Sequence, residues 1–123
     1  MLGTVFVIIL VMREVEFFVY LKSDLYENND RIRVRLQLEK GKLLDAMHQY
    51  ETFDDCKWLA VVRFDCAHGQ GFHKDLMYPN GDKEKADVEV FSLEEFSLYA
   101  RQDLNLKWKL YKEWYFKLKR NKA

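Results

Sequence analysis

The chain has 123 residues, 49% hydrophobic and 15% aromatic, so it can bury the core of one domain but not of two. Twenty basic and twenty acidic residues give a formal net charge of zero, which excludes attraction to nucleic acid by the charge of the whole molecule. The charge is unevenly placed, because residues 101–123 contain eight Lys or Arg and only two acidic residues, a net charge of +6. Two cysteines without C-x-x-C spacing indicate a reducing compartment, and we expect a cytoplasmic protein.

The first residues, MLGTVFVIILVM, form an apolar run of about ten residues. This run is too short for a transmembrane helix, which needs ~20 apolar residues, and it lacks the basic start and cleavage site of a secretory signal. We therefore expect a strand from about residue 5 and no membrane partner. Met12 is a second candidate start of translation, because residues 14–22 already form a complete strand pattern.

Strand-like segments joined by turn residues fill the chain as far as residue 91. They cover residues 14–22, 31–39, 42–51, 57–65, 73–78 and 83–91. Residues 31–39 alternate cleanly: the apolar even positions face one side of the strand, and the odd positions carry Arg31, Arg33 and Arg35. Short turns such as Lys40-Gly41 favour antiparallel pairing, since parallel strands need crossovers of a dozen or more residues.

A long helix over residues 92–120 is predicted by its start and by its periodicity. Ser92 is the expected N-cap, with Glu95 as its capping-box partner and Phe91 stapled to Phe96. An apolar stripe then follows at steps of three and four, formed by Leu93, Phe96, Ala100, Leu104, Trp108, Tyr111, Tyr115 and Leu118.

We expect this stripe to lie on the sheet face that bears Ile32, Val34 and Leu36, and the helix to break near residues 103–105. The predicted fold class is α+β. It is a single domain, residues 1–123, in which an antiparallel meander of five to six strands is covered by the long C-terminal helix.

The segment RFDCAHGQGFHK, residues 63–74, contains two of the three histidines. Histidine transfers protons near neutral pH, so His73 is the candidate acid or base and His68 its partner. Asp65 would orient an imidazole, while Arg63 and Lys74 would bind phosphate. This set suits metal-independent cleavage of RNA, in which a base activates the 2′-hydroxyl. His73→Ala should then abolish activity and change stability by less than ~1 kcal/mol. The alternative is that both histidines are structural loop residues.

Other candidate sites are weaker. His68 and His73 lie near Asp65 and Asp75, but zinc needs three convergent protein ligands and neither cysteine completes a familiar set. We therefore predict no metal and no cofactor. His48 is expected to be a strand histidine without a catalytic role.

The three arginines of residues 31–39 could track an RNA backbone. Arg31, Arg33 and Arg35 share the polar side of one strand, at a spacing of ~7 Å. The alternative is a solvated sheet face on which these arginines pair with acidic neighbours such as Glu14 and Glu16.

The order of these segments resembles the TumE-like toxin family of toxin–antitoxin modules. The matching positions are Phe64-Asp65, His68-Gly69, Gly71, His73-Lys74 and Phe91-Ser92. The chain is similar, too, to a group of small archaeal and bacterial proteins with a tyrosine-aspartate-x-alanine-histidine-glycine core. In that comparison Phe64 replaces a tyrosine, which removes a hydroxyl group. Lys74 replaces an arginine, which removes the planar guanidinium that can bind a phosphate through two parallel hydrogen bonds.

The resemblance implies a toxin-like protein that acts on or binds RNA, with a cognate antitoxin as partner. The alternative function is a non-catalytic binding or assembly protein, which forms a homodimer or pairs through its amphipathic helix.

Overall fold

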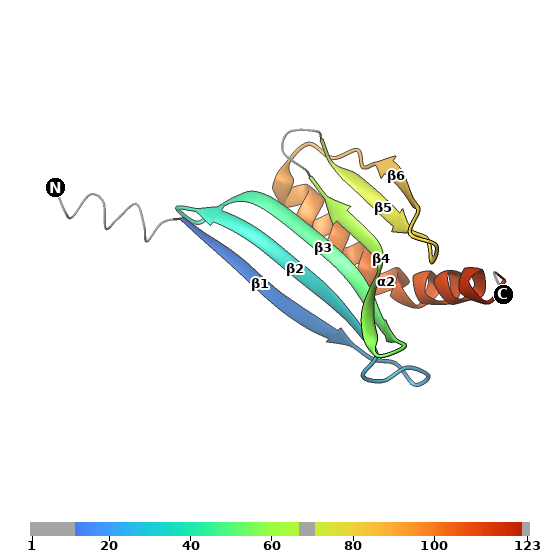
Figure 1. Ribbon diagram of the computed structural model, residues 1–123. Helices are drawn as coiled ribbons and strands as arrows, with labels where there is room; N and C mark the ends of the chain where they lie inside the picture. Colours follow the sequence, from blue (N-terminus) through green and yellow to red (C-terminus); the bar gives the residue numbers. More distant parts are fainter. Residues whose placement is uncertain (1–11, 67–70, 122–123) are drawn as a thin grey trace.

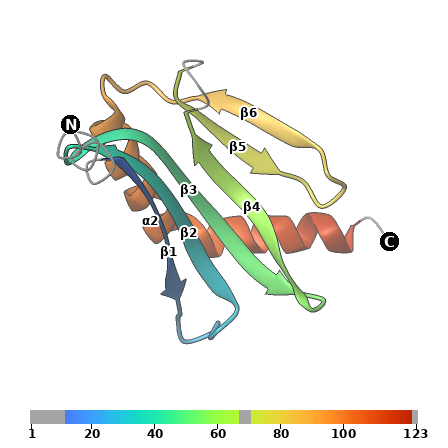
Figure 2. The same ribbon diagram turned by 60° about the vertical axis from the view of Figure 1, so that its left-hand side comes forward.

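The computed structural model describes residues 12–66 and 71–121 (Figure 1). The elements follow in the order β1 (Met12–Leu21), β2 (Asp30–Glu39), β3 (Lys42–Asp54), β4 (Lys57–Asp65), β5 (His73–Met77), β6 (Lys83–Asp87) and α2 (Leu93–Arg120). Each strand pairs antiparallel with the next, so the sheet has the spatial order β1-β2-β3-β4-β5-β6. The helix crosses one face of this sheet (Figure 2). The predicted α+β meander with a C-terminal helix is confirmed, whereas the strand expected before residue 12 lies outside the described residues.

Two tight hairpins set the register of the central strands. The β2–β3 turn is Lys40-Gly41, with φ angles of 52° and 77°, and the β3–β4 turn is Asp55-Cys56, with 52° and 63°. Two-residue hairpins of this kind need positive φ at both positions, because only that twist matches the twist of the strands. The register that results aligns the apolar positions of β2, β3 and β4 on the face that α2 covers.

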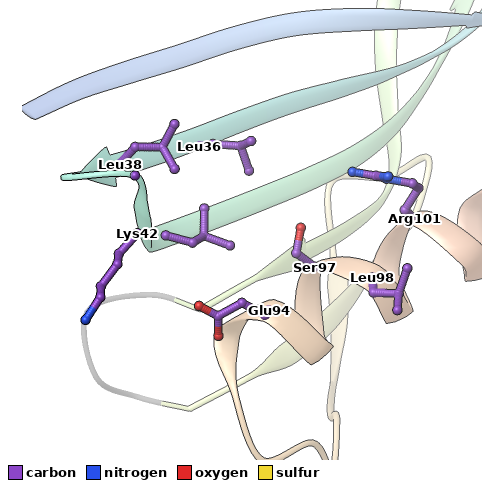
Figure 3. A pocket seen from close by; sticks show the side chains of 9 residues that line it. Leu36, Leu38, Lys42, Glu94, Ser97, Leu98 and Arg101 are labelled. Atoms are coloured by element: carbon purple, nitrogen blue, oxygen red, sulfur yellow. The ribbon is translucent and has the colours of Figure 1, made fainter. Parts of the chain in front are cut away.

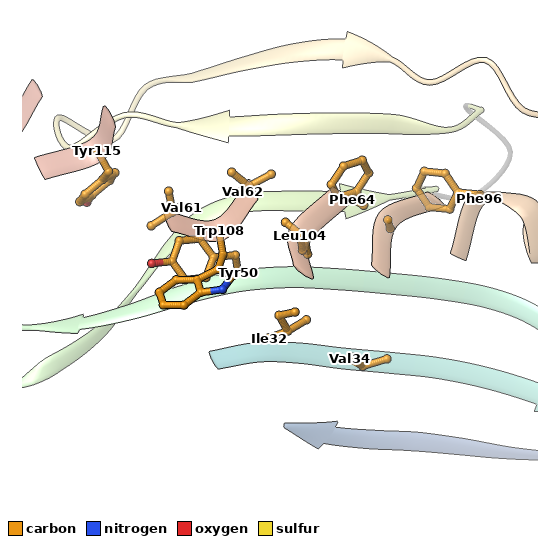
Figure 4. Close-up of a cluster of buried hydrophobic side chains, with 11 residues drawn as sticks. Ile32, Val34, Tyr50, Val61, Val62, Phe64, Phe96, Leu104, Trp108 and Tyr115 are labelled. Atoms are coloured by element: carbon orange, nitrogen blue, oxygen red, sulfur yellow. The ribbon is translucent and has the colours of Figure 1, made fainter. Parts of the chain in front are cut away.

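The hydrophobic core lies between α2 and this face of the sheet. Phe96, Ala100 and Leu104 are completely buried, and they belong to one hydrophobic cluster with Ile32 and Val34. Figure 4 shows the cluster, from Val34 on β2 to Tyr115 near the end of the helix. Burial of such side chains stabilises the fold by roughly 1.5–3 kcal/mol each.

The helix runs without interruption from Leu93 to Arg120, so the predicted break near residues 103–105 is wrong. Asp103 does not disrupt the helix, because its carboxylate binds side chains of the same helix instead of competing for backbone N–H groups. It accepts a hydrogen bond of 2.5 Å from the Tyr111 hydroxyl and lies 3.2 Å from the Lys107 ammonium group.

The predicted N-cap is confirmed, since the Ser92 hydroxyl accepts a 3.1 Å hydrogen bond from the Glu95 backbone N–H. The Glu95 carboxylate accepts from the Phe91 backbone N–H, rather than from that of Ser92. The staple is wrong, because Phe91 is 98% exposed. In the extended segment before the helix, Val88 and Val90 pack against the core, so Phe91 points outward.

A buried polar cluster joins the helix to the sheet. The Lys112 ammonium group donates a 2.8 Å hydrogen bond to Asp30, and the Tyr50 hydroxyl donates a 2.6 Å bond to the same carboxylate. All three side chains are buried. Because a buried carboxylate is stable only when its oxygens are paired, this cluster fixes where α2 sits on the sheet.

Candidate functional site

The candidate residues lie mainly on the sheet face opposite α2, which we call the open face. Because Ile32 and Val34 are buried under the helix, the intervening side chains of β2 point the other way. The strand register extends this assignment to the neighbouring strands. The open face thus carries Glu14, Glu16, Phe18, Tyr20, Arg31, Arg33, Arg35, Met47, Gln49, Glu51, Arg63, Asp65, His73 and Asp75.

A polar cavity of about 210 Å³ lies in the open face, and we call it the arginine cavity. It is lined by Arg33, Arg35, Met47, Gln49, Arg63 and Asp65. The Arg63 guanidinium donates a 2.6 Å hydrogen bond to the side-chain oxygen of Gln49. Within residues 12–66 and 71–121, Arg63 forms no ion pair, so its remaining N–H groups are available to an anion.

The arginines of β2 are paired with carboxylates. Arg33 lies 2.6 Å from Glu16, and Arg35 lies 3.5 Å from Glu14 and 3.8 Å from Glu16. The hydrogen bond from Arg33 lowers the pKa of Glu16, and the charges of both arginines act in the same direction. Arg33 and Arg35 thus pair with the acidic neighbours that the alternative interpretation names, although such exposed pairs are worth only about 0–1 kcal/mol.

An aromatic patch, which the sequence interpretation missed, surrounds Arg31 at one end of the open face. The Arg31 guanidinium lies 4.1 Å from the centre of the Phe18 ring and 3.9 Å from that of Trp58, and its Nε is 2.7 Å from Glu51. The Tyr20 ring lies 6.4 Å from that of Trp58. The signal in the sequence was the alternation within each strand, which puts Phe18 and Tyr20 on one side of β1 and Arg31 on the polar side of β2; only the β1–β2 register shows that these two sides form the same face.

Asp65 and His73 are directly opposite each other in the β4–β5 pair. The Asp65 carboxylate accepts a 2.8 Å hydrogen bond from the Cys66 backbone N–H. His73 is only 4% exposed, and its Nε2 lies 3.9 Å from Asp75. The structure therefore brings these two predicted residues together at one strand end, and His68 lies outside the described residues.

Lys74 does not join this site, and its prediction as a phosphate ligand beside Arg63 is wrong. It follows His73 in β5, so its side chain points to the opposite face, under α2. Its ammonium group donates a 2.6 Å hydrogen bond to the Tyr111 hydroxyl and lies 3.8 Å from Asp103. Burial lowers the pKa of Lys74, and the Asp103 charge opposes that effect.

His48 is buried on the helix side of β3, as expected for a strand histidine. Its Nε2 lies 2.8 Å from the Ser97 hydroxyl, and its Nδ1 has no hydrogen-bond partner among the described residues. Burial lowers the pKa of His48 to about 4, and the positive charge of Arg101 contributes to the shift. No carboxylate of the described residues orients this imidazole, so Ser97 and His48 do not form a nucleophilic triad.

The described part of the chain contains no group of three or more His, Cys, Asp or Glu residues that could hold a metal ion. Nor does it contain a helix that is long and apolar enough to cross a membrane.

Comparison with known proteins identifies a family but no activity. Neither the curated proteins nor the solved structures include a match to this chain. A family described as "Domain of unknown function (DUF7718)" matches residues 12–121, a range that contains all six described strands and the helix. The chain therefore belongs to the DUF7718 family.

Proposed function

We propose that the protein binds single-stranded RNA on the open face of its sheet. The observation that supports this proposal is the position of the arginine cavity beside the aromatic patch on one continuous surface. Proteins that bind single strands combine cations along the backbone with aromatic side chains on which bases stack. Each stacked base is worth about 1–3 kcal/mol, because every base has an aromatic face.

The individual residues support different parts of this interaction. Arg63, which has no carboxylate partner among the described residues, is the leading phosphate ligand. Arg35 is 45% exposed in its side chain and only loosely paired, so a phosphate can compete for it. Tyr20 is the most exposed aromatic of the patch, and it is the residue on which a base would stack first.

Binding is better supported than cleavage. His73 is buried, Asp65 is engaged with the backbone and Lys74 faces the helix, so none of these groups is presented to a substrate as the catalytic hypothesis requires. Action as a toxin, with a cognate antitoxin as partner, rests on the resemblance to TumE-like proteins.

The test is fluorescence anisotropy with a labelled single-stranded oligouridine at several salt concentrations. We expect the affinity to fall between 50 and 200 mM salt, because each phosphate contact releases counterions. Each contact should contribute about −0.7 to the slope of the logarithm of the binding constant against the logarithm of the salt concentration. Arg63→Ala should remove about one such contact, and Tyr20→Ala should weaken binding without changing the slope.

Arg120→Ala is the matched control, because Arg120 is an exposed arginine in the last turn of α2 and lies outside the arginine cavity. Equal losses for Arg63→Ala and Arg120→Ala would contradict the proposal, because the binding would then depend only on total charge. An absence of binding at low salt would contradict it as well.

A second candidate function is self-association through β1. This ten-residue strand has one strand neighbour, β2, within the described part of the chain. It also exposes Phe17, Phe18, Val19 and Tyr20, and an exposed apolar edge of this length is a template for pairing with another chain. Sedimentation velocity over a hundredfold range of concentration tests it. A dimer that Val19→Lys dissociates is the expected result, and a monomer at every concentration would contradict it.

A further inference from the structure

A second hollow lies on the helix side of the sheet, which is the face opposite the open face. α2 packs mainly on β3 and β4, so β1, whose Phe17 and Val19 are about 40% exposed, extends beyond the helix on this face. Two cavities of about 400 and 330 Å³ lie there, and Arg101 lines both of them. We call them together the groove. Its volume falls in the range of ~300–1,000 Å³ that is usual for sites of small ligands.

The walls of the groove are mainly apolar. Phe17, Val19 and Val34 line the smaller cavity, and Leu36, Leu38 and Leu98 line the larger one. Figure 3 shows Leu36 and Leu38 on the β2 side of the larger cavity and Ser97 and Arg101 on the helix side. Such walls favour a ligand with a hydrocarbon chain, because the chain leaves water when it enters the groove.

The groove also contains a cation whose charge is not neutralised. Arg101 forms no ion pair with any carboxylate in residues 12–66 and 71–121. Arg31, Arg33 and Arg35 differ, since each of them lies within 4 Å of a glutamate. A guanidinium beside apolar walls is well suited to a carboxylate, which it can bind through two parallel hydrogen bonds.

A buried polar atom lies next to this cation. His48 lines the smaller cavity and is 1% exposed, and its Nδ1 has no partner among the described residues. The charge of Arg101 is one of the two causes that lower the pKa of His48, so the two groups are close enough to affect each other. The other charged residues that line the groove are Lys42 and Glu94.

From this arrangement we infer that the groove binds an aliphatic carboxylate, with its carboxylate on Arg101 and its hydrocarbon chain along the β1–β2 wall. The inference does not depend on RNA binding, because the groove and the arginine cavity lie on opposite faces of the sheet and share no lining residue.

The experiment is isothermal titration calorimetry of the full chain with decanoate, below the concentration at which it forms micelles. Arg101→Ala should weaken binding about tenfold or more, since it removes a charged hydrogen-bond donor. Arg120→Ala is the matched control and should bind as the unchanged protein does. Decan-1-ol, which has the same chain length without the charge, should bind at least tenfold more weakly than decanoate. Equal affinity of the two arginine variants, or of the two ligands, would overturn the inference.

A spectroscopic readout distinguishes this site from non-specific adsorption. A carboxylate bound to Arg101 changes the electrostatic field at the His48 imidazole, which the charge of Arg101 already affects. At pH 7, where decanoate is ionised, its addition should therefore shift the NMR resonances of the His48 ring in the full chain and not in Arg101→Ala. Unshifted His48 resonances at saturating decanoate would overturn the inference even if heat is released on mixing.

Two further variants test other occupants of the groove. Val19→Trp should block the chain of the ligand and leave thermal stability nearly unchanged, because Val19 is 41% exposed. Ile8→Asp tests whether the apolar residues 1–11 occupy the groove themselves. If the full chain binds decanoate only when it carries Ile8→Asp, the occupant is that segment and the inference fails. If sedimentation shows a dimer that decanoate does not affect and that Leu98→Lys, a change on the helix side of the larger cavity and away from β1, dissociates, the occupant is a second copy and the inference fails too.

Discussion

Replacing Lys112 by methionine tests how α2 is attached to the sheet. The Lys112 ammonium group is 2.8 Å from Asp30, and both side chains are buried. Methionine keeps most of the apolar stem of lysine, and it removes the ammonium group that lies 4.0 Å from the centre of the Tyr26 ring. The substitution therefore removes mainly the charge and leaves the Asp30 carboxylate with Tyr50 as its remaining side-chain partner.

The expected loss of unfolding free energy is about 3–5 kcal/mol, the range found when one partner of a buried ion pair is removed. Lys119→Met is the matched control. The Lys119 ammonium group lies 2.5 Å from Asp54, closer than Lys112 lies to Asp30, but the side chains of Lys119 and Asp54 are both about 40% exposed. Water already solvates these charges, so we expect a loss of about 0–1 kcal/mol.

Urea denaturation followed by tryptophan fluorescence measures both values, since Trp108 is buried against Tyr50 and reports on the helix–sheet contact. The double variant Asp30→Asn/Lys112→Met removes both charges, and it should lose less stability than the two single variants combined. If Lys112→Met and Lys119→Met lost the same free energy, or if the double variant were additive, the buried pair would not be what fixes the helix.

Three other predictions follow from single contacts. Because the pKa of His48 is about 4 in the fold and near 6.5 when unfolded, the unfolded chain takes up the proton first as the pH falls through this window. The unchanged protein should therefore lose about 2 kcal/mol more than His48→Gln between pH 7 and pH 5 in urea denaturation, and an equal loss would contradict this. Ser92→Ala should cost about 1 kcal/mol in thermal unfolding and Ser92→Asp much less, since aspartate also caps. His73→Ala should cost about 1–3 kcal/mol, more than for a loop residue, because His73 is a buried strand residue; a loss below 0.5 kcal/mol would restore the loop interpretation.

The sequence was most informative where local chemistry alone decides the structure. The alternation in residues 31–39 predicts which side of β2 is buried, because successive strand residues point to opposite faces. Ser92 predicts the start of α2, because its hydroxyl satisfies a backbone N–H that the helix leaves free. The stripe of Phe96, Ala100 and Leu104 predicts how the helix is rotated on the sheet.

The candidate site was harder to predict, because it depends on pairing between strands. The sequence interpretation places His73 and Lys74 in one site, because both belong to the segment 63–74. In β5 their adjacency sends the side chains to opposite faces, with Lys74 under the helix. The carboxylate partners of Arg33 and Arg35 come from β1, and the partner of Arg31 from β3, so they depend on register as well. Periodicity within one strand contains no information about which strand lies beside it.

β2 contributes to both proposed sites, and its alternation explains how one small sheet can carry two of them. Arg33 and Arg35 line the arginine cavity, whereas Val34 and Leu36 line the groove on the other face. The principal cations, Arg63 and Arg101, share no hydrogen-bond or ion-pair partner among the described residues. Free energies of substitution at such independent positions usually add within ~0.5 kcal/mol. We therefore expect Arg63→Ala to lower the affinity for RNA without changing the affinity for decanoate. Arg101→Ala should lower the affinity for decanoate without changing the affinity for RNA. If either variant lowered the affinity for both ligands equally, the substitution would have disturbed the shared strand β2, and the two sites could not be treated as separate.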